Sequence, residues 1–134
     1  MTIRVQSEFY SPKQCRENPN SLYVFGDNTQ RVGTGGQACI RAEHNSVGLA
    51  TKDTCGRYFS DKNFDRNKVF INDDIFNIRE KMLNDMYEEL VLPAMGLGTG
   101  LSDMQNQCPR TFLYLCERLL DEFNFNNFAS LKSL

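Results

Sequence analysis

The chain lacks the marks of several common classes of protein. Its 15 Lys and Arg residues are outnumbered by 17 Asp and Glu, so the net charge is −2 and there is no basic excess to attract duplex nucleic acid. No stretch approaches the roughly 18 consecutive apolar residues of a membrane span, and residues 1–10 lack the apolar core of a secretory signal. We therefore expect a cytoplasmic protein that binds neither duplex nucleic acid nor a membrane.

Metal-binding patterns are missing from the sequence as well. The five cysteines form no Cys-x-x-Cys pair, and His44 is the only histidine. A structural zinc site needs four nitrogen or sulfur ligands at close spacing. We therefore expect reduced, mostly buried thiols, no metal and no cofactor. A nucleophilic cysteine paired with His44 stays open, because the spacing selects no particular cysteine for it.

With 134 residues and 40% hydrophobic content, the chain has the size and composition of one domain, residues 1–134. Apolar runs bounded by turn residues predict strands. Gly26 ends the second of these runs, and a proline ends the last. The runs are residues 3–9, 22–25, 47–51 and 89–93.

Helix signals alternate with the strand signals. Caps and apolar spacing predict helices over residues 12–17, 37–43, 72–84 and 109–123, with residues 69–71 as a further strand or a lead-in to the third helix. This alternation predicts an α/β domain with a mostly parallel central sheet flanked by helices. The third and fourth helices should each bury one apolar stripe, formed by Ile75, Phe76, Ile78, Met82 and Leu83 and by Phe112, Leu115, Cys116, Leu119 and Leu120.

Two segments resist assignment. Residues 52–68 are polar, with Gly56 and scattered aromatics, and resemble a long loop of the kind that is often functional. Its residues Lys52, Arg57, Tyr58 and Phe59 are candidates to cover a crevice, where an aromatic ring would stack on a base or only pack. Residues 124–134 hold three phenylalanines among asparagines. Packing on the core, self-association into a homo-oligomer and a loose tail all stay open for this segment.

The nine glycines are ordinary in number but clustered in position. Each of two clusters follows a predicted strand and precedes a predicted helix, although neither has the spacing of a Rossmann or P-loop motif. Glycines let the backbone approach a ligand closely and expose N–H groups to an anion. Two such loops at one end of a parallel sheet predict a shared crevice for a diphosphate. The clusters are Gly26, Gly33, Gly35 and Gly36, and Gly96, Gly98 and Gly100.

The two loops resemble those of the macro domain family, which binds ADP-ribose and related nucleotides. The stretch LYVFGDNTQRVGTGGQACIR has the family's order of strand, asparagine-containing loop, glycine run and helix, and VLPAMGLGTGLSDM is similar to its second phosphate loop. The resemblance covers residues 21–42 and 88–120. It implies a macro-like nucleotide-binding domain, with Asn28 at the ribose and both glycine runs at the phosphates.

The resemblance is to a minimal, divergent member of the family. The chain is short, the second loop carries one extra residue, and Glu8 is the only acid near the position where the family reads adenine. Short length and many asparagines are also typical of small phage proteins. The expected ligand-binding residues are Gly26, Asp27, Asn28, Gly33, Gly35, Gly36, Gln37, Gly96, Gly98, Thr99 and Gly100.

Candidate catalytic groups lie beside the two loops. Asp27 and Asn28 are suited to bind ribose hydroxyls or orient a water, or else to form an Asx turn. Asp103 is a candidate general base or turn cap. Arg31 is a candidate phosphate ligand, and His44 a candidate acid–base group or helix C-terminal cation.

Three functions follow from these features. The first, which the sequence favours, is a binding module that holds ADP-ribose or a cyclic nucleotide signal, for example to sequester it as a phage anti-defence protein. The second is a hydrolase of an ADP-ribosyl or nucleotide ester bond that uses Asn28 with Asp27 or Asp103. The third is a protein-interaction module that uses the phenylalanine-rich C-terminal segment.

Overall fold

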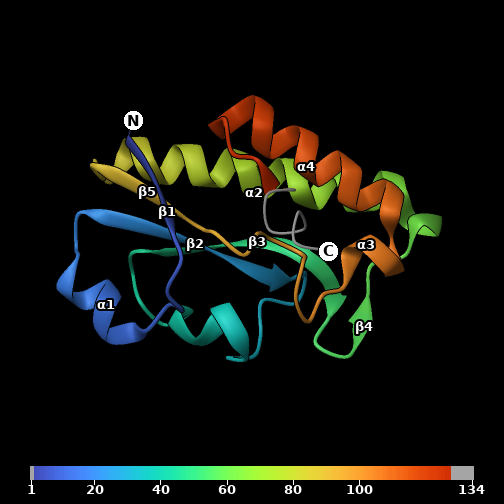
Figure 1. Ribbon diagram of the computed structural model, residues 1–134, viewed down its shortest axis with the longest axis horizontal. Coiled ribbons are helices and arrows are strands. Elements are labelled where there is room, and N and C mark those ends of the chain that lie inside the picture. The colour runs from blue at the N-terminus through green and yellow to red at the C-terminus, as the bar shows by residue number, and fades with distance from the viewer. Residues whose placement is uncertain (1, 128–134) are drawn as a thin grey trace.

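A five-stranded sheet forms the middle layer of the computed structural model, which describes residues 2–127 (Figure 1). The strand order is β1-β5-β2-β3-β4; the first four strands in this order are parallel and β4 is antiparallel to β3. The predicted α/β class with a mostly parallel sheet is therefore confirmed. The strands are β1 (Thr2–Gln6), β2 (Ser21–Asn28), β3 (Ser46–Thr54), β4 (Arg57–Tyr58) and β5 (Glu89–Pro93).

Helices cover both faces of this sheet (Figure 1). On one face lie α2 (Phe64–Asn84) and α4 (Pro109–Phe123), and on the other α1 (Pro12–Glu17) and the 3₁₀ turn η1 (Gly36–Ile40). Alternate residues of β2 enter the two resulting cores: Leu22 and Val24 join the core under α2 and α4, and Tyr23 and Phe25 join the core under α1 and η1. Two shorter helical segments, η2 (Asp61–Asn63) and α3 (Met104–Gln107), precede α2 and α4.

Three elements have the bounds that the sequence predicts, namely α1, β5 and α4. The Ser11 hydroxyl accepts a hydrogen bond from the Gln14 N–H at 3.1 Å and so caps α1. Pro109 is the first residue of α4, where a missing N–H costs nothing. The bounds of these three elements are determined by residues at or next to their ends, such as caps and prolines.

Other predicted boundaries are wrong. Strand β1 ends at Gln6 rather than at residue 9, whereas β2 passes through Gly26 to Asn28 because Asp27 and Asn28 still pair with β3. The helix predicted over residues 37–43 is the shorter turn η1. The short helix α3, which begins at Met104, was not predicted.

The long loop predicted over residues 52–68 does not exist. The segment holds the end of β3, then β4, η2 and the first turn of α2, and residues 69–71 are helical rather than a strand. In this first turn Asp65 and Arg66 face solvent and the buried position is taken by a polar residue, Asn67, whereas the buried residues that follow at helical spacing, Ile71, Ile75, Ile78 and Met82, are apolar. The polar composition of residues 52–68 led to the prediction of a loop, because composition alone does not show which positions are buried.

The predicted apolar stripes are only partly correct. Phe76 and Leu83 on α2 are 61% and 74% exposed, and Leu120 on α4 is 51% exposed. In α2 the buried stripe is narrower than predicted and begins one turn earlier. Of the C-terminal segment 124–134, Phe125 and Asn127 are buried in the domain, and residues 128–134 lie outside the described residues.

The outer edge of β3 is held by α2. The Asp74 carboxylate is 3% exposed and accepts a hydrogen bond from the Ala50 N–H at 2.7 Å. An N–H at the margin of the parallel strands is thereby satisfied within the protein. Burial raises the pKa of Asp74, against the opposing effects of this N–H and of the Arg31 guanidinium.

Three of the five cysteines, Cys15, Cys108 and Cys116, are buried free thiols, as expected; Cys39 is half-buried and Cys55 is exposed. Burial raises the pKa of Cys15 to about 11 and that of Cys108 to about 12, so neither is a ready nucleophile. Within residues 2–127, no helix combines the length and apolar character that a membrane crossing requires.

One buried side chain joins α1 to the sheet, and its removal tests the packing of this face. The fully buried Asn45 Nδ2 lies 2.9, 3.1 and 3.0 Å from the carbonyl oxygens of Cys15, Asn18 and Ser21. Asn45→Ala removes all three contacts, although the Cys15 and Asn18 carbonyls keep the N–H groups of Asn18 and Ser21 as partners. The loss of these buried hydrogen bonds should lower the free energy of unfolding by about 2–3 kcal/mol in urea titrations.

The matched control is Asn84→Ala at the exposed end of α2, where the amide bonds only the Glu80 carboxylate. Its effect should stay within about 0.5 kcal/mol. Equal stability of the two variants would contradict the anchoring role of Asn45.

Candidate functional site

The sheet divides between β2 and β5, and this fork makes room for a cavity. The two strands pair only over Ser21–Tyr23 of β2 and Glu89–Val91 of β5. Beyond that point β5 ends at Pro93 and the Ala94 N–H bonds Gln6 of β1, while β2 continues beside β3 to Asn28. Two loops therefore leave neighbouring strands at the same end of the sheet, which we call the first glycine loop (29–35) and the second glycine loop (94–103).

Side chains satisfy the backbone groups that the fork exposes. The Tyr10 hydroxyl donates to the Val24 carbonyl at 2.9 Å and lies 3.4 Å from that of Val91, so it spans the two strands. Further along, Gln37 Oε1 accepts the Gly26 N–H at 2.8 Å, and its Nε2 donates to the Gly96 carbonyl at 3.3 Å. Gln37 thus connects β2 to the second glycine loop where no strand does so.

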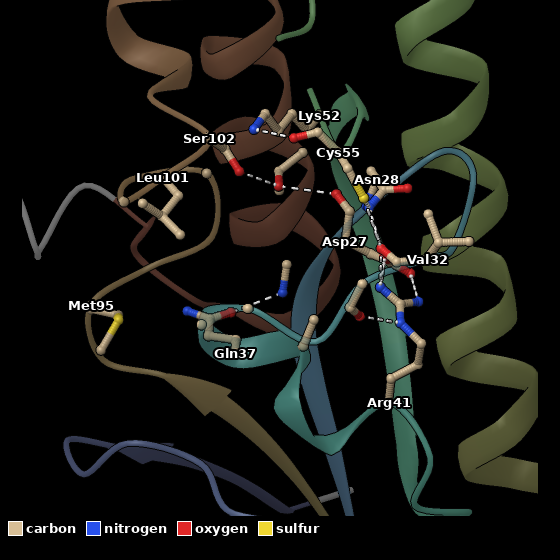
Figure 2. Close-up of a pocket in the computed structure, with 18 of the residues that line it drawn as sticks. Asp27, Asn28, Val32, Gln37, Arg41, Lys52, Cys55, Met95, Leu101 and Ser102 are labelled. Carbon is tan, nitrogen blue, oxygen red and sulfur yellow. Dashed lines mark hydrogen bonds and ion pairs between the residues drawn. The ribbon is translucent and has the colours of Figure 1, made fainter. Parts of the chain in front are cut away.

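The cavity lies between the two glycine loops and measures about 420 Å³ (Figure 2). This is within the range of small-molecule sites. Ten of the eleven expected ligand-binding residues line it: Gly26, Asp27, Asn28, Gly33, Gly35, Gly36, Gln37, Gly96, Gly98 and Gly100.

The exceptions among the predicted site residues bond elsewhere. Thr99 does not line the cavity, and its hydroxyl donates to the Met95 carbonyl within the second glycine loop. Asp103 also lies outside the lining, has a left-handed backbone with φ of 44°, and accepts from the Asn106 and Gln107 side-chain amides. His44 and Arg31 do not line the cavity either.

Asp27 is the most enclosed charged group of the site. Its carboxylate is buried and accepts two hydrogen bonds from the Arg41 guanidinium and one from the Asn28 N–H (Figure 2). A Cβ at Gly48 would lie 2.3 Å from Asp27 Oδ2, so only glycine fits beside this carboxylate. The Asp27 oxygens are therefore occupied by protein groups.

Arg41 shapes the first glycine loop and was not predicted from the sequence. Beyond its ion pair with Asp27, it donates from Nε to the Gly33 carbonyl at 2.8 Å and from Nη2 to that of Val32 at 3.2 Å. Its guanidinium also lies 5.3 Å from the centre of the Phe25 ring. The only sequence signal for Arg41 is its place shortly after the glycine run, and an arginine there is ordinary.

Asn28 closes the turn that begins the same loop. Its Nδ2 donates to the Val32 carbonyl at 2.8 Å and its Oδ1 accepts the Gln30 N–H at 3.0 Å, an Asx turn as the sequence suggested. Arg31 follows with φ of 58°, which directs its guanidinium to Asp74 at 2.7 Å and to within 3.6 Å of Asp27. One arginine thus connects the loop to both buried carboxylates.

The second glycine loop is fixed from two sides. Gly98 has φ of +80°, and a Cβ there would lie 2.3 Å from Met104 Sδ, so close packing against α3 requires glycine. The Leu97 N–H donates to Asn127 Oδ1 at 2.8 Å, and Asn127 Nδ2 donates to the Leu97 carbonyl at 2.9 Å. Asn127 is far away in sequence, and nothing in the chain's pattern signals this contact.

Several backbone N–H groups along the cavity have no protein acceptor among residues 2–127. They include those of Gly33 and Gly35 of the first glycine loop and of Gly98 and Gly100 of the second. Unpaired N–H groups from two facing loops are a common means of binding phosphate oxygens. The arrangement is therefore chemically suited to an anion with at least two acceptor groups.

The wall formed by β3 adds further polar groups that sequence analysis did not select. The Thr51 hydroxyl lies 2.8 Å from that of Ser102, which connects β3 to the second glycine loop. Lys52 also lines the cavity, and its Nζ donates to the Cys55 carbonyl at 2.9 Å (Figure 2). The exposed Cys55 thiol donates to the Val32 carbonyl at 3.3 Å, across the first glycine loop.

Removing the Asp27 carboxylate separates a structural role from a catalytic one. Asp27→Ala leaves Arg41 without its counter-ion, so the free energy of unfolding should fall by about 3 kcal/mol in chemical denaturation. This value is at the low end for a buried pair, because the Arg41 side chain keeps 21% of its exposure to water. Asp121→Ala, at an exposed position on α4, is the control and should change stability by less than about 0.5 kcal/mol. Wild-type stability of Asp27→Ala would show that the carboxylate is free for another role.

Comparison with known proteins places the chain in one family. No curated protein and no solved structure matches it. A family model described as a family of unknown function, DUF7831, matches residues 5–118, which include both glycine loops and all residues that line the cavity. The chain belongs to the DUF7831 family.

Proposed function

We propose that this protein binds a phosphorylated nucleotide, ADP-ribose or a close derivative, between its two glycine loops. The observation that carries the proposal is that the N–H groups of Gly33, Gly35, Gly98 and Gly100 have no acceptor among residues 2–127 and border one cavity of about 420 Å³. A diphosphate has acceptor oxygens on two phosphorus atoms, so one phosphate can accept hydrogen bonds from the first glycine loop and the other from the second. The resemblance of both loops to those of macro domains supports the same ligand class.

The ribose next to the diphosphate is proposed to contact Asn28. The Asn28 carbonyl oxygen already accepts one hydrogen bond from Gln30, but an amide oxygen has two lone pairs and can accept another from a sugar hydroxyl. Because Asn28 is 8% exposed and fixed at both ends of its amide, it would bind without losing side-chain freedom.

The base of the nucleotide is proposed to occupy a smaller depression that adjoins the cavity. This depression measures about 200 Å³ and shares Gly36, Gln37 and Met95 with the cavity. Phe9 lines it and is 83% exposed, an unusual exposure for a phenylalanine and one that leaves its ring free to stack on a base. Glu8, beside it, is available to accept from an exocyclic amine.

Binding is favoured over hydrolysis by the state of the two carboxylates. Asp27 is engaged by Arg41, and Asp103 by Asn106 and Gln107, so each would have to leave its partners to act as a base. A module that holds its ligand intact would sequester a signal nucleotide, the role that the sequence suggested for an anti-defence protein. Hydrolysis of the bound nucleotide is the alternative.

Titration calorimetry with ADP-ribose, using two matched glycine variants, tests the proposal. A Cβ at Gly35 would meet nothing within 4 Å and the backbone there is extended, so Gly35→Val should fold while filling the ligand's space. Gly56→Val, in the β3–β4 turn, adds the same side chain to equally open space outside the cavity lining. We expect micromolar binding by the wild type and by Gly56→Val, and affinity weaker by about tenfold or more for Gly35→Val.

Two results would contradict the proposal. Equal affinity of the two variants would place the ligand elsewhere, and absence of binding by the wild type to ADP-ribose, its cyclic isomers and cyclic dinucleotides would favour the protein-interaction module. Mass spectrometry after incubation with excess protein separates the alternatives, because recovery of intact ligand excludes hydrolysis of that ligand.

A further inference from the structure

A basic surface lies where β4, η2 and the N-terminal ends of α2 and α4 meet, at the end of the sheet that also holds the cavity (Figure 1). We define this basic surface by its five cations, Arg57, Lys62, Arg66, Lys68 and Arg110. Four of them belong to the segment that the sequence suggested was a functional loop, and Arg110 joins them from α4. The acidic overall composition of the chain conceals this local clustering, since it arises only in the fold.

The basic surface contains a depression of about 350 Å³. Lys62, Arg66 and Arg110 line it, together with Phe64 and the acids Asp61 and Asp65. Three cations from two separate segments therefore border one concave site. A depression of this size accommodates a phosphate with part of its attached sugar.

The nearby carboxylates compensate part of this positive charge, and one of them, Asp65, pairs with Lys68 at 3.5 Å. The Asp61 carboxylate accepts the Arg110 and Thr111 N–H groups, each at 2.9 Å; burial opposes this, yet these hydrogen bonds hold its pKa below the ordinary value. It therefore serves as the cap of α4. Asp53 pairs with Arg66 at 3.0 Å and reaches Arg57 at 4.0 Å. Among residues 2–127, Lys62 and Arg110 form no ion pair with a carboxylate.

Aromatic rings hold some of these cations in place. The Arg110 guanidinium lies 3.9 Å from the centre of the Phe64 ring, and the Lys68 ammonium 4.8 Å from the same ring. Two like charges gathered at one ring repel each other, and an anion between them relieves that repulsion. Tyr58, directly after Arg57, is 42% exposed, and the Lys52 ammonium lies 5.0 Å from the centre of its ring.

We propose that this basic surface binds the phosphate backbone of a single-stranded polynucleotide. Interleaved cations and aromatic rings are the combination that binds single strands, with phosphates at Lys and Arg and bases stacked on rings. An acidic peptide would use the cations but not the rings. The site is separate from the nucleotide cavity and does not depend on what that cavity binds.

Fluorescence anisotropy of a labelled oligothymidylate of roughly 12 nucleotides tests this site at low salt. Lys62→Glu removes an exposed lysine of the basic surface, and Lys13→Glu removes an exposed lysine of α1, 83% exposed, with the same change in net charge. Arg110→Glu is a second variant, and a glutamate near the start of α4 is favourable for the helix. Thermal unfolding of each variant confirms that it folds.

We expect the wild type and Lys13→Glu to bind alike, and Lys62→Glu and Arg110→Glu to bind about tenfold more weakly. Each lost phosphate contact should reduce the slope of log K against log salt by about 0.7. Equal weakening by Lys62→Glu and Lys13→Glu, or no salt-dependent binding by the folded wild type, would overturn the proposal. Tighter binding of a duplex, or equal displacement by oligoglutamate, would overturn it in favour of those partners. Loss of ADP-ribose binding in Gly35→Val leaves this outcome unaffected, so the two proposals fail separately.

Discussion

Backbone hydrogen bonding at the fork between β2 and β5 is the constraint on which the site depends. A buried strand cannot leave its N–H and carbonyl groups unpaired, so two strands that diverge need other partners. Tyr10 and Gln37 supply them, at Val24 and Gly26 on one side and at Val91 and Gly96 on the other. The cavity exists because side chains, rather than a sixth strand, occupy the opening. Tyr10 and Gln37, which bridge this opening, therefore also complete the hydrogen bonding of the sheet.

The buried charges make the cavity rigid. Asp27 and Asp74 are both almost fully enclosed, and Arg31 contacts both while Arg41 contacts Asp27 and two carbonyls of the first glycine loop. Removing water from such charges is costly unless every one is paired, so the loop is held to the one arrangement that pairs them. Gly48 shows how tightly the surroundings fit, because no other residue leaves room for the Asp27 carboxylate.

The sequence predicted features that short-range chemistry determines. The bounds of α1, β5 and α4 depend on a serine cap and on prolines, and the two glycine clusters were expected to meet because carboxyl ends of parallel strands share an edge. Gln37 was selected for its place in a loop, but its role as a connection across the fork depends on a distance between strands. Arg41 and Asn127 were not selected, because their partners are set only by the tertiary fold. Residues 52–68 were misassigned because the first turn of α2 buries Asn67 rather than an apolar residue, so no apolar pattern marks the start of the helix.

The contact between Asn127 and Leu97 has a consequence for the order in which the molecule is built. A domain generally folds as a unit, and during synthesis its later residues are the last to become available. The second glycine loop gains its hydrogen bonds to Asn127 only after that residue has emerged from the ribosome. A ribosome-bound chain that ends before Asn127 therefore lacks the partner of the Leu97 N–H and carbonyl groups, which fixes the second glycine loop from one of its two sides.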